Sequence, residues 1–157
     1  MQRFYASLTA AIIFISTPAL GTCGISEFYD QNAQKTRVVS SFAGAGYFDQ
    51  VLFSKNRPDS NYTLSFILKQ REKVIFVSGS IKFTASVFPI AFLGSTFSDD
   101  KKEIITTEAS FDASGPTARY ILTSRSATIT LDSKNFGKIN WVVPGYLLEE
   151  WKAVIKR

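Results

Sequence analysis

The sequence predicts an α+β fold, a meandering antiparallel sheet with one helix before it and one after it. Three observations lead to this prediction. Apolar and polar residues alternate at the two-residue period of strands through most of residues 47–143. A polar segment over residues 26–43 opens with a helix-capping residue. The tail over residues 146–157 places apolar residues at helical spacing.

Residues 1–22 have the composition of a secretory signal peptide. Arg3 supplies a positive charge, and the following run from Phe4 to Leu20 is uncharged and mostly apolar. A basic start, an apolar middle and an exit of small residues are typical of export signals. We therefore expect residues 23–157 to form the mature protein. This length suits one domain with its own core and is too short for two ordinary ones.

The N-terminal segment can be interpreted in three ways. Leu20-Gly21-Thr22-Cys23 resembles the lipobox of bacterial lipoproteins, in which the cysteine becomes the first mature residue and receives acyl chains. Thr22 fits less well, because Gly, Ala or Ser usually precedes that cysteine. Ala19-Leu20-Gly21 is also a small-x-small site for an ordinary signal peptidase, which would leave Thr22 as the N-terminus. An uncleaved anchor is the third option, although its apolar run of about 17 residues is short for a bilayer.

Lipid attachment is the leading interpretation of Cys23. It is the only cysteine of the chain, so no disulfide can form within the domain. An unpaired thiol in an oxidising compartment invites pairing between molecules. Acylation at this position would explain why an exported protein contains a single, unpaired cysteine.

The first helix is expected over residues 26–43. Ser26 is a suitable N-cap, and Glu27 lies in the first turn, where a negative charge favours the helix dipole. Gly44 then offers a stop. This helix would lay one narrow apolar stripe on the sheet.

The strands follow from period-two alternation and from the turn residues between them. They are expected, in order, over residues 47–54, 62–68, 73–78, 81–87, 105–111, 119–124, 127–131 and 139–143. Gly79 is read as a break between two of them. Pro89 is expected to limit pairing, because proline has no backbone N–H. Residues 98–102 are read as a charged turn.

The tail from Tyr146 to Arg157 is expected to be an amphipathic helix after the break at Pro144-Gly145. Its apolar stripe consists of Leu147, Leu148, Trp151, Val154 and Ile155. Lys152, Lys156 and Arg157 complement the negative C-terminal end of its dipole.

Composition excludes several classes of function. The chain contains no histidine, which removes the commonest general base and metal ligand. The net charge of +5 is scattered rather than gathered on one face, which disfavours nucleic-acid binding. No nucleophile elbow, Ser-x-x-Lys motif or phosphate loop occurs. The carboxylate pairs Asp99-Asp100 and Glu149-Glu150 read as solvated charges. We therefore expect no enzyme, no cofactor and no metal site.

The fourteen phenylalanines are the remaining unusual feature. Most occupy alternating strand positions, so core packing is the expected role. The densest run, residues 83–97, is too short and too interrupted to span a membrane. We expect a contact surface formed by Phe83, Phe88, Phe92 and Phe97. The alternative is a phenylalanine-lined cavity for an apolar ligand.

Two short runs resemble a pattern in small, uncharacterised envelope lipoproteins of bacteria. They are the corner Phe42-Ala43-Gly44-Ala45-Gly46-Tyr47-Phe48-Asp49-Gln50-Val51 and the strand opening Asp59-Ser60-Asn61-Tyr62-Thr63-Leu64. The resemblance covers residues 36–157. It implies an envelope protein or an accessory to an assembly, and it brings no catalytic residue. Such lipoproteins usually begin with an additional strand, which the sequence before residue 36 does not indicate.

Two functions are therefore expected. The first is a non-enzymatic envelope lipoprotein, tethered to the membrane through Cys23 with periplasmic exposure, that binds another envelope protein or supports an assembly. The alternative is a soluble periplasmic or secreted protein, beginning at Thr22, that binds an apolar ligand.

Overall fold

The computed structural model describes residues 23–31, 34–100 and 103–157. The elements in these ranges follow in the order β1 (Cys23–Asp30), β2 (Lys35–Ala45), β3 (Phe48–Arg57), β4 (Asn61–Gln70), β5 (Phe76–Phe83), β6 (Ser86–Asp100), β7 (Ile104–Asp112), α1 (Pro116–Thr123), β8 (Ala127–Ser133), β9 (Gly137–Val142) and α2 (Gly145–Lys156). The signal peptide expected over residues 1–22 lies outside the described residues.

The helix expected over residues 26–43 is wrong, because this segment forms β1 and most of β2. Val38, Ser40 and Phe42 are buried at every second position, which is the period of a strand. Gly46, with φ at 68°, lies in the turn from β2 to β3 and does not end a helix. The fold is therefore mostly antiparallel β, and the α+β prediction is corrected.

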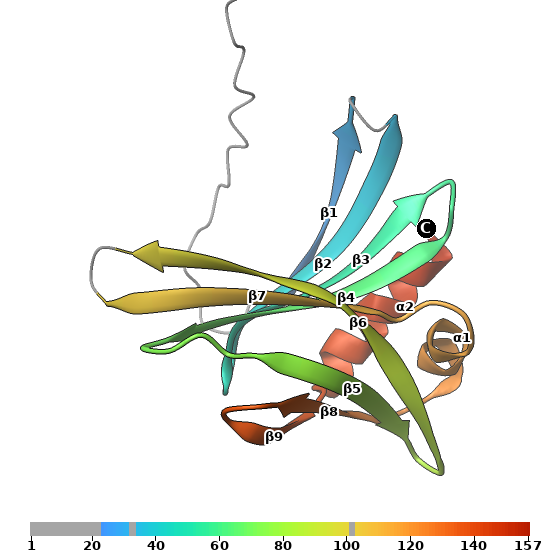
Figure 1. The fold of residues 1–157 in the computed structure, drawn as a ribbon. Coiled ribbons are helices and arrows are strands. Elements are labelled where there is room, and N and C mark those ends of the chain that lie inside the picture. Colours follow the sequence, from blue (N-terminus) through green and yellow to red (C-terminus); the bar gives the residue numbers. More distant parts are fainter. Residues whose placement is uncertain (1–22, 32–33, 101–102) are drawn as a thin grey trace, which may run out of the picture.

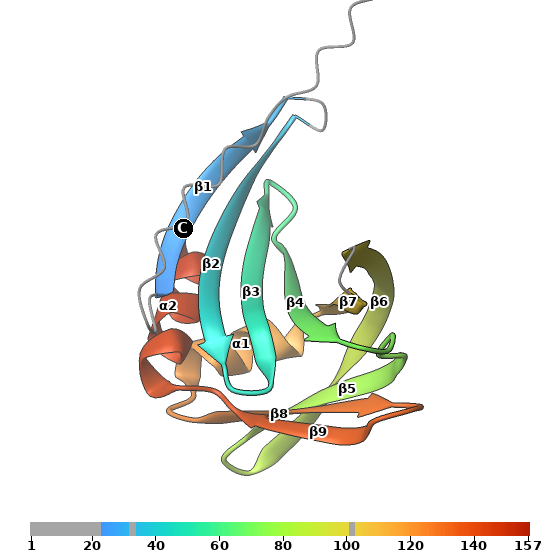
Figure 2. The ribbon, with the colours of Figure 1, turned by 90° about the vertical axis from the view of Figure 1, so that its left-hand side faces the viewer.

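All neighbouring strands pair antiparallel in the order β1-β2-β3-β4-β7-β6-β5-β8-β9. The sheet curls strongly, so β1–β4 run across the direction of β5, β8 and β9 below them (Figures 1 and 2). The inner face of this curl carries the hydrophobic core.

Strand β6 joins the two halves of the sheet. Residues 86–90 pair with β5, and residues 91–100 pair with β7. The register shifts between Phe92 and Gly94, and Gly94 has φ at 150°. A strand that changes sheets at a bulge is a common way to turn a corner. Pro89 lies inside β6 opposite Ser80 of β5, and the pairing of β6 with β7 begins only at Ala91.

Helix α2 confirms the predicted tail helix and lies against β1, β2 and β3 (Figure 2). Trp151 is fully buried. Its ring stacks on Phe53 of β3 at 5.1 Å between centroids, and Trp141 of β9 lies 6.4 Å away. A buried tryptophan of this kind contributes about 3–5 kcal/mol to stability relative to alanine. It connects two distant strands of the curl.

Helix α1 replaces the strand expected over residues 119–124. Pro116 begins the helix, where its fixed φ suits the first turn and its missing N–H is not needed. Thr117, Ala118 and Ile121 are buried at helical spacing. The other expected strands overlap β3, β4, β5, β7, β8 and β9.

Candidate functional site

Cys23 is the first residue of β1, and its backbone pairs with Phe42 of β2. The start of β1, the turn from β2 to β3 and the start of α2 lie at the same end of the molecule (Figure 2). Tyr47 in this turn and Tyr146 in α2 are 45% and 52% exposed. The Tyr146 ring contacts Phe42, with 5.9 Å between centroids.

The four phenylalanines of the expected contact surface lie in two separate groups. Phe83 is buried and Phe88 is half-buried against the core. Their rings contact Tyr120 of α1, with centroids 5.8 Å and 4.4 Å away. An open hollow of about 370 Å³ lies beside Phe83 and Tyr120 and extends to Arg125. Tyr120 is absent from the predicted contact surface, because the sequence predicts a strand over residues 119–124 and the structure has a helix there.

Phe92 and Phe97 lie on the outer half of β6, which pairs with β7, and the bulge between Phe92 and Gly94 separates them. They are 37% and 42% exposed. The ring of Phe92 packs on that of Phe111 of β7, with 5.4 Å between the ring centroids. The ammonium of Lys73 lies 5.2 Å from the ring centroid of Phe97. A second open hollow, of about 310 Å³, lies at the bulge around Gly94 and reaches Glu108 of β7. Only this pair of the four remains available to a partner.

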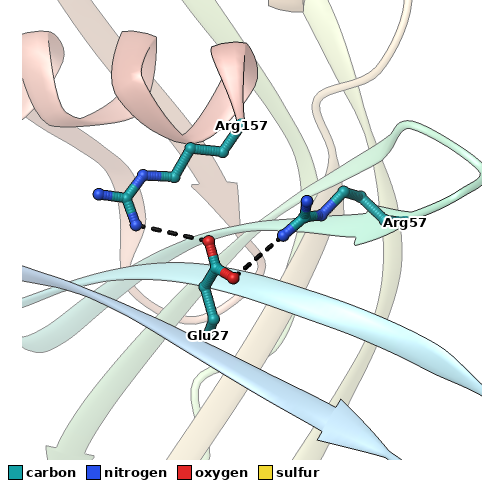
Figure 3. Close-up of polar contacts among 3 residues, drawn as sticks. All are labelled: Glu27, Arg57 and Arg157. Atoms are coloured by element: carbon teal, nitrogen blue, oxygen red, sulfur yellow. Dashed lines mark hydrogen bonds and ion pairs between the residues drawn. The ribbon is translucent and has the colours of Figure 1, made fainter.

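A small ionic cluster fastens β1 to the rest of the fold (Figure 3). Glu27 of β1 accepts a hydrogen bond from Arg57 Nη2 of β3 at 3.1 Å. Its other oxygen lies 3.5 Å from Nη1 of Arg157, directly after α2. The three residues are far apart in the sequence, so no local pattern could have predicted the cluster. All three side chains are partly exposed, so the cluster is a surface fastening rather than a buried ion pair.

Lys55 of β3 is the buried cation of the described residues. Its ammonium donates a hydrogen bond to the carbonyl oxygen of Ile155 at 2.8 Å and lies 5.8 Å from the ring centroid of Tyr62. The last carbonyls of a helix lack partners within the helix and carry its negative dipole end, so a cation there is favourable. Burial raises the pKa of the Tyr62 hydroxyl. These contacts secure the end of α2 and form no reactive pair.

The acidic side chains considered from the sequence do not converge. Glu149 pairs with Lys152 within α2, and Glu150 accepts a hydrogen bond from Ser40 of β2 at 2.9 Å. Asp99 lies near the end of β6, and the side chain of Asp100 is not described. Across the described ranges, no group of three or more His, Cys, Asp or Glu side chains is placed to hold a metal ion. Neither α1 nor α2 has the length and apolarity to cross a bilayer.

The arrangement therefore places Cys23 in the edge strand β1 and leaves Phe92 and Phe97 exposed on the outer half of β6. Comparison of the chain with protein-family models, with curated proteins and with solved structures found no match.

Proposed function

We propose that the protein is a non-enzymatic lipoprotein of the bacterial cell envelope, tethered through Cys23 and binding another protein. The observation that carries the proposal is the position of Cys23. It is the last residue of the lipobox-like run, and it already lies within β1, where its backbone pairs with Phe42 of β2. Cleavage before Cys23 would leave a chain that enters the sheet at its first residue.

The absence of a spacer has a mechanical consequence. In the described structure β1 pairs with β2 from Cys23 onward, so acyl chains on that residue would hold the domain directly at the bilayer. The exposed Tyr47 and Tyr146 at the same end suit this location, because tyrosine is favoured at the boundary of lipid and water. Two acyl chains are needed for stable anchoring, since a single chain binds membranes only marginally.

Protein binding is favoured over small-ligand binding by the way the phenylalanines are used. In the core, Phe48, Phe66 and Phe111 pack on one another, with ring centroids 4.8 Å and 5.8 Å apart. This packing lends no support to a phenylalanine-lined cavity. The exposed pair Phe92 and Phe97 instead lies on an outer strand, where another polypeptide has access.

Metabolic labelling with a radioactive fatty acid tests the anchor. The wild-type chain should take up label and fractionate with membranes, and Cys23→Ser should lose both properties. Thr22→Ala, which brings the run closer to the usual lipobox, should label at least as well as wild type. Equal labelling of wild type and Cys23→Ser, or no labelling of either, would refute the anchor.

A further inference from the structure

In the part of the chain that the structure describes, the free edges of the sheet include β1, β9 and the outer half of β6. Free edges expose unpaired N–H and C=O groups, and proteins usually protect them with charges or by keeping them short. β1 carries Glu27 on its inner face. β9 has six residues and includes Lys138. These two edges carry the usual protection.

The outer half of β6 lacks this protection until its end. From residue 91 onward it pairs with β7 alone, and no described strand lies on its other side (Figures 1 and 2). Between Phe92 and Ser98 it contains no charged residue and no proline. Phe92, Leu93 and Phe97 are exposed here, Leu93 to 60%. Its main chain is therefore suited to accept another strand.

We propose that a second copy of this chain adds to this edge, so that two β6 strands pair antiparallel about a two-fold axis at Phe97. A free edge can always pair with its own copy in this way, because an antiparallel pair has two-fold symmetry. With Phe97 opposite its counterpart, the paired run extends from Gly94 to Asp100. Ser95 then lies opposite Asp99 of the second copy.

The side chains of the inner face favour this register. Ser95, Phe97 and Asp99 share that face, since they pair with Ala109, Thr107 and Ile105 of β7. Two polar groups on this face lack partners in the part of the chain that the structure describes. The Ser95 hydroxyl is buried and finds no hydrogen-bond partner among the described residues. No ion pair or hydrogen bond joins the Asp99 carboxylate to another residue of the described ranges.

Pairing with a second copy would satisfy both groups. Side chains directly opposite on an antiparallel pair have Cβ atoms about 4.5–5.5 Å apart, which lets the Ser95 hydroxyl donate to the Asp99 carboxylate of the second copy. The two Phe97 rings would meet on the axis. A strand with an apolar residue opposite Asp99 would leave that carboxylate without a partner, so the edge selects its own copy.

The pairing geometry rests on the proposed contact role of β6, whereas the extent of pairing in membranes also depends on the lipid anchor. A short pair of strands is weak in free solution. Tethering to one membrane raises the effective concentration of each copy. We therefore expect the dimer mainly in membranes.

Disulfide crosslinking in membranes from cells that express the full chain tests the pairing. Phe97→Cys should form a disulfide dimer, because opposite Cα atoms about 4.5–5.5 Å apart lie within disulfide range. Val142→Cys is the matched control, since Val142 is 70% exposed on β9. The crosslinked fraction should be about tenfold higher for Phe97→Cys, because thiols held in range act at high effective concentration.

A second pair of variants tests the register. Ser95→Cys and Asp99→Cys, co-expressed with different tags, should crosslink to each other. Neither should crosslink to its own copy, since equivalent positions would lie about 13 Å apart along the strand. Equal crosslinking of Phe97→Cys and Val142→Cys, or failure of the mixed pair, would overturn the proposal.

The parent chain without an added cysteine separates this test from that of the anchor. Acylated Cys23 has no free thiol, so the parent should not crosslink. Crosslinking of the parent would contradict the anchor. Repeating the variants in the Cys23→Ser chain, which lacks that thiol, would then decide the β6 pairing alone.

Discussion

Gly79 shows how the lack of a side chain decides where two strands lie. A Cβ at this position would come within 2.9 Å of Ile90 Cγ1 and of Leu131 Cδ2, which belong to the strands on either side of β5. Gly79→Ala should therefore lower the free energy of unfolding by about 1–3 kcal/mol, the usual cost of overpacking a core. Urea denaturation measures the change.

Gly145→Ala is the control for this substitution. A Cβ at Gly145, the first residue of α2, would meet nothing within 4 Å. Alanine there should raise stability slightly, by about 0.4–1 kcal/mol, because it reduces the freedom of the unfolded chain. Equal effects of the two variants would contradict the close packing of β5.

Tyr62 makes stability depend on alkaline pH. Burial raises its pKa above the ordinary value of 10.0, so the folded chain holds the hydroxyl proton more tightly than the unfolded chain. This contribution to stability is fully present below the unfolded pKa and is lost as pH rises through the folded pKa. The free energy of unfolding of Tyr62→Phe should therefore fall less than that of wild type as pH rises above about 10.

Denaturation of wild type and Tyr62→Phe at a series of pH values measures this difference. Identical slopes for wild type and Tyr62→Phe would show that burial of Tyr62 does not shape the pH dependence.

At the scale of elements, β1 depends on contacts with both β2 and α2. Glu27→Gln removes the charge that holds Arg57 and Arg157. Because these side chains are partly exposed, the free energy of unfolding of the whole domain should fall by less than about 1 kcal/mol. Local opening of the edge strand should nonetheless increase, and hydrogen exchange of the β1 amides should accelerate.

Glu149→Gln is the matched control, since it breaks a surface ion pair within α2. It should leave exchange in β1 at the wild-type rate. If Glu27→Gln also leaves the hydrogen-exchange rates of the β1 amides unchanged, pairing with β2 is sufficient to hold β1 in place.

Period-two alternation predicted the strands with a clear apolar face. This pattern did not predict the elements whose conformation depends on contacts with residues far away in the sequence. Residues 26–43 look helical because Ser26 and Glu27 fit a helix start, yet pairing of β1 with β2 buries Val38 and Phe42. Residues 119–124 look extended because they include Ile121 and Thr123, although Pro116 signals a helix start. In both cases tertiary contacts outweigh local preference.

The candidate surface was predicted only in part, because the change of pairing partner along β6 is not visible in the sequence. Four phenylalanines in one run suggest one surface. Phe88 lies in the part of β6 that pairs with β5 and Phe92 in the part that pairs with β7, and the curl buries Phe83 while Phe97 remains exposed. The ionic cluster of Glu27, Arg57 and Arg157 depends on the whole topology, so no local pattern could indicate it.

At the scale of the whole molecule, we propose that Cys23 attaches one end of the curl to the membrane and that the free edge of β6 binds a second copy of the chain. Cys23 enters the sheet without a spacer, and the Tyr47 and Tyr146 side chains are exposed at the same end. A rigid domain attached in this way has little freedom to rotate away from the bilayer. Its orientation then decides which surfaces a partner can reach.

The intact mass of the mature protein, purified from a bacterial host with an active lipoprotein pathway, tests the central claim most directly. If Cys23 carries the lipid anchor, the mature chain should consist of residues 23–157 and carry the added mass of two or three acyl chains. The Cys23→Ser variant should lack this added mass. A chain that begins at Thr22 with no added mass, or an uncleaved chain of 157 residues, would contradict it.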